Sequence, residues 1–235
     1  MHVSEKWLLL LLLGSLVLAS PLAAQGLRLH TLAATGTAQE VLASLQNGAD
    51  FNDRDFTGVT ALMAAAGYNH NPDVLPVLLR YGAVVDARDK NGETALMEAA
   101  ERNSDPAVIT ALLSGGASLE CRDKLERTPL IYAAKCNPSL DVLSALLKGG
   151  AKVNAQDSYG MSPLLYAAWV GQNPAIVSAL LSAGADAKAR STSGRTLLEY
   201  AEDNPVLVKD EQVLRRLQEA VKDTEASAEH SQFKD

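Results

Sequence analysis

Few residues of this chain are of the types that carry out catalysis. A catalytic site needs a nucleophile beside a base, or an acid paired with a base, and a metal site needs several His, Cys or carboxylate ligands at close spacing. The four histidines are His2, His30, His70 and His230, and no two of them share a helix face or a ligand spacing. No glycine-rich phosphate loop follows a strand pattern. We therefore expect a protein that is not an enzyme and that takes no metal or cofactor.

Four aspartates recur at one position and could be mistaken for a site: Asp55, Asp89, Asp123 and Asp157. In three of the four cases a glycine follows three residues later. Aspartate bonds the backbone ahead of it and glycine supplies a positive φ, so the pair forms a tight turn. In the remaining case Glu126 stands where the glycine is expected. A side chain in a left-handed position costs about 1 kcal/mol, so this turn is either strained or of another type. We interpret the aspartates as turn formers.

These turns are spaced 34 residues apart, and two further motifs keep the same period. A Gly-Ala pair begins at Gly48, Gly82, Gly116, Gly150 and Gly184. A motif with Thr or Ser two residues before Leu begins at Thr60, Thr94, Thr128, Ser162 and Thr196. Unrelated motifs that share one period indicate stacked copies of one supersecondary unit, as in a solenoid.

Residues 82–115 show how one unit is built. Gly82 takes the left-handed position that follows the preceding helix. Thr94 caps a first helix, and Asp105 caps a second helix that starts at Pro106, where the missing N–H does no harm. The second cap is filled in successive units by Thr37, Asn71, Asp105, Ser139 and Asn173. Capping and periodicity therefore agree on helix pairs.

The apolar stripe of the second helix turns polar at both ends of the array, as the terminal units of a stack require. We predict a signal peptide at residues 1–24 and one repeat domain at 25–222. The domain divides into an N-terminal cap at 27–47, full repeats at 48–81, 82–115, 116–149 and 150–183, and a C-terminal cap at 184–222. Residues 223–235 lack an apolar stripe, which predicts a disordered tail.

The repeated residues resemble the ankyrin repeat family, with its Thr-Pro-Leu-His-x-Ala-Ala helix start and its Asp-x-x-Gly turn. Its Gly-Ala-Asp-Val-Asn junction is similar to Gly48-Ala49-Asp50-Phe51-Asn52 and to Gly150-Ala151-Lys152-Val153-Asn154. The resemblance covers residues 27–221. It implies an all-α solenoid of stacked helix–turn–helix units with short β-turn or hairpin connections.

Besides Glu126, the chain departs from the family pattern in two ways. The motif histidine is replaced in successive units by Met63, Met97, Ile131, Leu165 and Glu199. We expect apolar packing to substitute for the hydrogen bonds of that histidine. Each repeat also carries one extra residue between its helices, in the segments Asn69–Pro72, Asn103–Pro106 and Asn137-Pro138.

The resemblance also implies a binding surface, which we call the concave face: the turn tips together with the exposed ends of the first helices. The family binds protein partners there. Aromatic residues and arginines dominate interface hot spots, and exposed apolar groups mark contact surfaces. The candidate binding residues are Phe56, Tyr68, Lys90, Arg102, Lys124, Leu125, Arg127, Lys135, Tyr159, Met161 and Trp169. Local packing against adjacent turns is the alternative for each large apolar group.

Three tyrosines, Tyr132, Tyr166 and Tyr200, occupy one position in successive units. Such a ladder suggests a ligand site, but these residues lie along the inner helix. We interpret them as packing residues.

The N-terminus resembles a secretory signal. Lys6 precedes a short apolar run, Trp7 to Leu18, which is too short to span a bilayer, and small residues lead to Ala24. Cleavage after Ala19 and an uncleaved membrane anchor are the alternatives. Cys121 and Cys136 are expected to stay unpaired, because the intervening helix separates its ends by about 10 Å and a bridge tolerates roughly 7 Å. With no Asn-x-Ser/Thr glycosylation site in the chain, these features favour a bacterial periplasm or secretion.

A formal net charge of −7 argues against a nucleic-acid partner. The sequence thus predicts an exported, monomeric interaction module that binds a protein and, once the signal is removed, no membrane. One alternative is a secreted effector that acts on a host protein. Another is a structural element of an envelope complex, held by an uncleaved N-terminal anchor.

Cleavage near Ala24 is the first testable prediction. The intact mass of the exported protein should lack residues 1–24. A mature chain that retains Trp7 would contradict the release of a soluble protein and favour the anchored alternative.

Overall fold

A computed structural model describes residues 29–232 of the chain, so the predicted signal peptide lies outside the described residues. Six first helices form one row: α2 (Leu29–Thr35), α4 (Ala61–Tyr68), α6 (Ala95–Arg102), α8 (Pro129–Cys136), α10 (Pro163–Val170) and α12 (Leu197–Glu202). The second helices form the other row: α3 (Ala38–Gln46), α5 (Val74–Arg80), α7 (Pro106–Ser114), α9 (Leu140–Lys148), α11 (Pro174–Ser182) and α13 (Glu211–Gln232). A short 3₁₀ helix, η3 (Leu207–Lys209), precedes α13.

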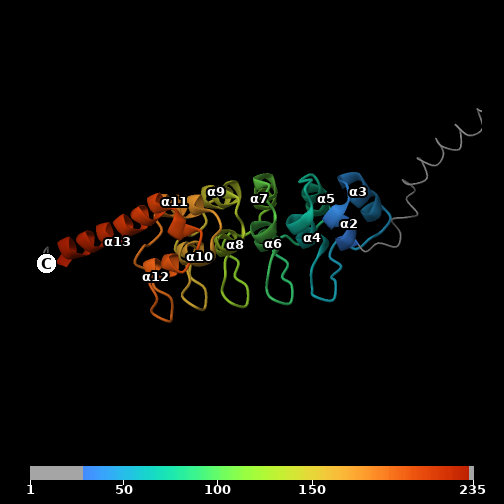
Figure 1. Cartoon of the computed structure of the whole chain (residues 1–235). Coiled ribbons are helices and arrows are strands. Elements are labelled where there is room, and N and C mark those ends of the chain that lie inside the picture. The colour runs from blue at the N-terminus through green and yellow to red at the C-terminus, as the bar shows by residue number, and fades with distance from the viewer. Residues whose placement is uncertain (1–28, 233–235) are drawn as a thin grey trace, which may run out of the picture.

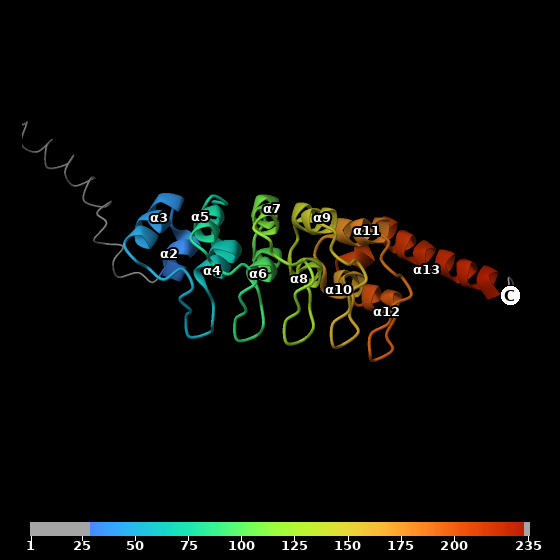
Figure 2. The ribbon, with the colours of Figure 1, turned by 180° about the vertical axis from the view of Figure 1, so that it is seen from behind.

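The two rows run side by side, and long turns project from the row of first helices, all to the same side (Figure 1). The view from behind shows the same arrangement (Figure 2). Between residues 29 and 232 there is no strand, and only an isolated bridge joins Arg54 to Thr60. The prediction of an all-α solenoid is confirmed.

The core runs the length of the stack between the two rows. In the unit built from α6 and α7, Ala99 and Ala100 are fully buried, and so are Ile109 and Leu112. The small alanines let neighbouring first helices approach closely, because interaxial distance depends on the side chains at the contact. The predicted apolar packing at the family's histidine position is found in four of the five units, since Met63, Met97, Ile131 and Leu165 are all buried. In the last unit Glu199 is exposed and forms a capping box with Thr196 instead.

Most of the predicted caps of the second helices are confirmed. Thr37, Asp105, Ser139 and Asn173 each accept a hydrogen bond from a backbone N–H of the first turn. The exception is Asn71, the predicted cap of α5. Its side chain accepts from Asp73 N, and α5 begins only at Val74. The reason is that Asn71 forms a turn of its own there, so the helix starts after that turn.

The aspartate column forms the turns, as predicted. The Oδ1 atom of Asp123 accepts from Leu125 N at 2.9 Å and from Arg127 N at 2.8 Å. Asp55, Asp89 and Asp157 accept from the same two positions of their own turns. Glu126 has a φ of 63°, and it is the one non-glycine residue with positive φ among residues 29–232.

Buried asparagines that follow the first helices join consecutive units. The side-chain amide of Asn137 donates to Ala100 O at 3.0 Å and to Asn103 O at 2.7 Å, both in the preceding unit. Asn69, Asn103 and Asn204 make the same paired contacts with their own preceding units. These bonds satisfy carbonyl oxygens at the ends of α2, α4, α6 and α10, where intrahelical donors are missing.

The turn tips are also joined to one another. Lys90 N donates to Thr57 O at 3.0 Å, and Lys124 N donates to Asn91 O at 2.9 Å. A column of arginines adds side-chain links, with Arg122 Nη1 donating to Gln156 O at 2.9 Å. Arg54 and Arg88 make the equivalent contact. The tips are therefore held in register along the stack.

The C-terminus differs from the sequence prediction. Helix α13 continues to Gln232, so residues 223–232 are helical where a disordered tail was predicted. That segment contains neither glycine nor proline and includes two alanines and two glutamates, which favour helix, so a packed helix can propagate beyond its apolar stripe. No helix between residues 29 and 232 is both long enough and apolar enough to cross a membrane.

Replacing Glu126 with glycine should stabilise the protein by about 1 kcal/mol, because the left-handed backbone no longer carries a Cβ. The greater freedom of glycine in the unfolded chain opposes this gain and could halve it. Urea titration measures the change.

Gly92→Ala is the matched control, at the sibling position with a φ of 85°. A Cβ there would lie 3.2 Å from the Asp123 Cα, so this variant should be destabilised. A clear loss of stability in Glu126→Gly would mean that its exposed ion pair with Arg122 outweighs the backbone strain.

Asn137→Ala should destabilise the protein by about 1–3 kcal/mol, because two buried carbonyl oxygens lose their donor. Asn91→Ala, at an exposed turn tip, is the control and should change the free energy of unfolding by less than about 0.5 kcal/mol. Equal effects of the two variants in urea titration would show that water replaces the Asn137 amide.

Candidate functional site

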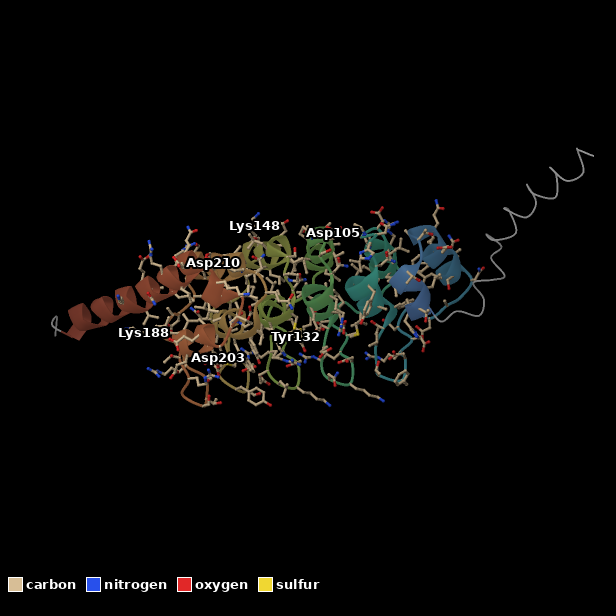
Figure 3. The ribbon with its side chains drawn as sticks, viewed as in Figure 1. Asp105, Tyr132, Lys148, Lys188, Asp203 and Asp210 are labelled. Atoms are coloured by element: carbon tan, nitrogen blue, oxygen red, sulfur yellow. The ribbon has the colours of Figure 1, made fainter. Side chains whose placement is uncertain are left out.

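The concave face lies on the side from which the turns project. Figure 3 shows Tyr132 and Asp203 on this side and Asp105 and Lys148 on the opposite side of the stack. Most of the sequence-predicted binding residues are exposed there: Phe56, Tyr68, Lys90, Arg102, Lys124, Leu125, Tyr159 and Trp169. Phe56 is the most open of the apolar and aromatic residues in this set, with 83% of its surface accessible. Arg127 and Lys135 are half-buried, and Met161 is buried.

The prediction that Met161 is exposed is wrong, because only 3% of its surface is accessible. Its backbone N–H is held by Asp157 Oδ1 at 2.9 Å, and its side chain packs in the hydrophobic core. The corresponding position of the preceding unit is Arg127, a residue that a solvent-facing position suits. The sequence alone therefore did not reveal the inward direction of the Met161 side chain.

Arg127 also differs from its predicted role, since its guanidinium is engaged within the protein. Its Nε donates to Asp123 Oδ2 at 2.7 Å, and its Cζ lies 4.6 Å from the centre of the Tyr132 ring. Glu93 adds a longer ion pair, at 3.7 Å. Burial alone would raise the pKa of Asp123, but hydrogen bonds from Arg127 and Tyr132 hold it below its usual value. Arg127 is therefore chiefly a structural residue.

Arg102 is committed in the same way. Its Nε donates to Glu98 Oε2 at 2.8 Å, its Nη2 pairs with Glu101 at 2.8 Å, and its Cζ lies 5.6 Å from the Tyr68 ring centre. Burial raises the pKa of Glu98 despite the nearby guanidinium. Arg102 is therefore engaged by Glu98, Glu101 and Tyr68 of its own stack.

The tyrosine ladder is a packing feature, as interpreted from the sequence. Tyr132, Tyr166 and Tyr200 are all buried. The Tyr132 hydroxyl lies 2.8 Å from both Glu93 Oε1 and Asp123 Oδ2, and the Tyr166 hydroxyl donates to Asp157 Oδ2 at 2.7 Å. Burial and these acceptors raise the pKa of both tyrosines well above the ordinary value.

Two of these tyrosines also line a pocket next to Trp169. The Trp169 ring stacks on Tyr166, with centroids 6.4 Å apart, and is tilted against Tyr200 at 5.7 Å. The indole is therefore partly supported by its own protein, and 42% of its surface remains accessible. The pocket has a volume of about 320 Å³, and we call it the aromatic pocket. Its apolar lining consists of Tyr159, Met161, Tyr166, Trp169 and Tyr200.

The remaining wall of the aromatic pocket is the next turn, Ser191, Thr192 and Ser193. These three residues are absent from the sequence-predicted binding residues. The repeat period contains the signal that would find them, because a step of 34 residues leads from Tyr159 to Ser193. Thr192 N donates to Tyr159 O at 2.9 Å, which holds the two turns side by side.

Three lysines of the concave face are available to a partner. Lys90, Lys124 and Lys135 form no ion pair with any residue in the described part of the chain. Lys135 has its Nζ 5.4 Å from the centre of the Tyr166 ring, at the aromatic pocket.

Comparison with known protein families identifies the family to which these stacked helix pairs belong. The family description for ankyrin repeats (three copies) matches residues 29–123 and 96–191. The chain belongs to the ankyrin repeat family. No curated protein matches it. Ankyrin repeats are non-catalytic binding modules that generally bind proteins, so the chain is not an enzyme.

The described ankyrin units show no sign of a metal centre either. Across residues 29–232, no three His, Cys, Asp or Glu side chains lie close enough together to hold a metal ion. Cys121 is half-buried, Cys136 is exposed, and both are free thiols.

Proposed function

We propose that this ankyrin repeat protein is exported and binds a protein partner through the concave face, with Trp169 as an anchor of the interface. The observation that carries the proposal is the difference between two kinds of position. Framework positions repeat from unit to unit, whereas the helix-end position of the concave face reads Gly67, Glu101, Lys135 and then Trp169. A large indole among small and charged siblings is not required by the stack.

Exposed aromatic groups on this face support a protein as the partner. Phe56, Tyr159 and Trp169 all present ring surface to solvent, and burial of such surface contributes about 25 cal/mol per Å². Tyr and Trp are also enriched among interface residues that carry binding energy. The partner would remove these rings from water.

Export rests on the N-terminal segment. The apolar run from Trp7 to Leu18, the preceding Lys6 and the small residues up to Ala24 support a periplasmic or secreted location. A host-directed effector and an anchored envelope element share the same fold and the same binding face, and differ in destination.

Trp169→Ala should weaken partner affinity by about 2 kcal/mol or more while leaving the stack folded, because it removes a central aromatic anchor. The partner is first captured by cross-linking to the wild-type protein and identified by mass spectrometry. Titration against the purified partner then measures affinity, and circular dichroism checks the fold.

Val84→Ala is the matched control, since Val84 is an exposed apolar residue outside the concave face. It should bind like the wild type. Unchanged affinity of a folded Trp169→Ala variant would move the interface to the charged tips at Lys90 and Lys124. A partner whose binding survives substitutions at all three positions would contradict the proposed function.

A further inference from the structure

We infer that the aromatic pocket accepts one aromatic side chain from an acidic, extended segment of the partner, and that a carboxylate beside that side chain pairs with Lys135. This inference rests on the proposed function and adds the chemistry of the partner at one site.

The aromatic pocket has the size and rigidity for a single side chain. Its volume of about 320 Å³ lies at the lower end of the range for ligand sites. The floor is buried and fixed: Met161 is held by its backbone, and Tyr166 by its hydroxyl bond to Asp157. Because the site exists before binding, little ordering is required of this protein when a side chain enters.

The lining favours an aromatic occupant. Tyr159 and Trp169 are both exposed at the pocket, so each offers ring surface to an incoming group. Aromatic pairs gain about 0.5–1.5 kcal/mol beyond area burial when their centroids lie 4.5–7 Å apart. Trp169 already holds that relation to Tyr166 and Tyr200. A further ring would extend an existing stack.

The charges around the pocket exclude a cationic occupant such as a methylated lysine. Lys135 lies 5.4 Å from the Tyr166 ring centre and Arg195 lies 4.4 Å from that of Tyr200, so two rings already hold a cation. Two carboxylates beside these rings are committed, because Asp157 accepts from Tyr166 and from its own turn, and Asp203 pairs with Arg195. A third cation would meet repulsion from Lys135 and Arg195, and neither Asp157 nor Asp203 is free to pair with it.

The same charges favour a carboxylate next to the ring. Lys135 has no ion pair within the described residues. Lys124, on the turn tip of the same repeat (116–149), also has none. Complementary charge at an interface steers association and selects among partners. An acidic segment that runs from the aromatic pocket towards these lysines would place its carboxylates near both Lys135 and Lys124.

The test uses the full chain with Trp7→Phe, so that Trp169 is the one tryptophan and its emission reports on the pocket. The probe is a capped peptide with one phenylalanine between two Asp-Asp pairs, which makes its direction unimportant. Matched probes carry alanine for phenylalanine, or Lys-Lys pairs for Asp-Asp, and tetramethylammonium stands for a cationic ligand. The acidic phenylalanine peptide should bind saturably and about tenfold or more tightly than each of the others.

Charge reversal provides the decisive comparison. Lys135→Glu should weaken the acidic peptide about tenfold and strengthen the Lys-flanked one. Lys148→Glu makes the same change in net charge on the opposite face of the stack and should leave both affinities unchanged (Figure 3). Circular dichroism confirms that both variants are folded.

Three results would overturn the inference: no saturable binding of the acidic peptide, tighter binding of tetramethylammonium or of the Lys-flanked peptide, or equal effects of Lys135→Glu and Lys148→Glu. Each of them leaves the proposed function standing if a captured partner still depends on Trp169. The two claims therefore fail separately.

Discussion

A single helix pair of this protein is too short to bury its own apolar stripe, so each unit depends on burial against its neighbours. In the central units, residues such as Ile109 and Leu143 are completely removed from water by the units on either side. Nearest-neighbour burial of this kind is what stabilises repeat proteins, and it forces the framework residues to recur at one period. The other features of the fold follow from this constraint.

Polar contacts between units fix how each unit is aligned with the next one. Buried asparagines such as Asn103 and Asn137 cap the first helices of preceding units, and backbone bonds join the turn tips. An apolar stripe alone would tolerate sliding, whereas a hydrogen bond to a particular buried carbonyl does not, because an unmade bond leaves a desolvated group. The concave face is therefore presented on a rigid support.

On this support, positions of the concave face divide into those used within the protein and those left for a partner. Arg102 and Arg127 are arginines of the kind that often act as hot spots, yet both are bound to carboxylates and tyrosines of their own stack. Tyr159 and Trp169 line the aromatic pocket, and Lys135 lies near Tyr166, a residue of the same pocket, without an ion pair of its own. Residue type identified all five as candidates, but only the contacts separate the two groups.

The repeat period, the caps of most second helices and the aspartate turns could be derived from the sequence, because each depends on hydrogen bonds within a few residues of the chain. Comparison with its sibling turns left two alternatives for Glu126, a strained left-handed position or another turn type, and the structure shows the left-handed position. Contacts across units could not be derived. The inward direction of Met161, the pairing of Arg127, the role of the buried asparagines and the pocket wall at Ser191–Ser193 all depend on the neighbouring unit. The sequence thus determined the unit and its repetition, while stacking decided which side chains are buried, which are paired and which remain for binding.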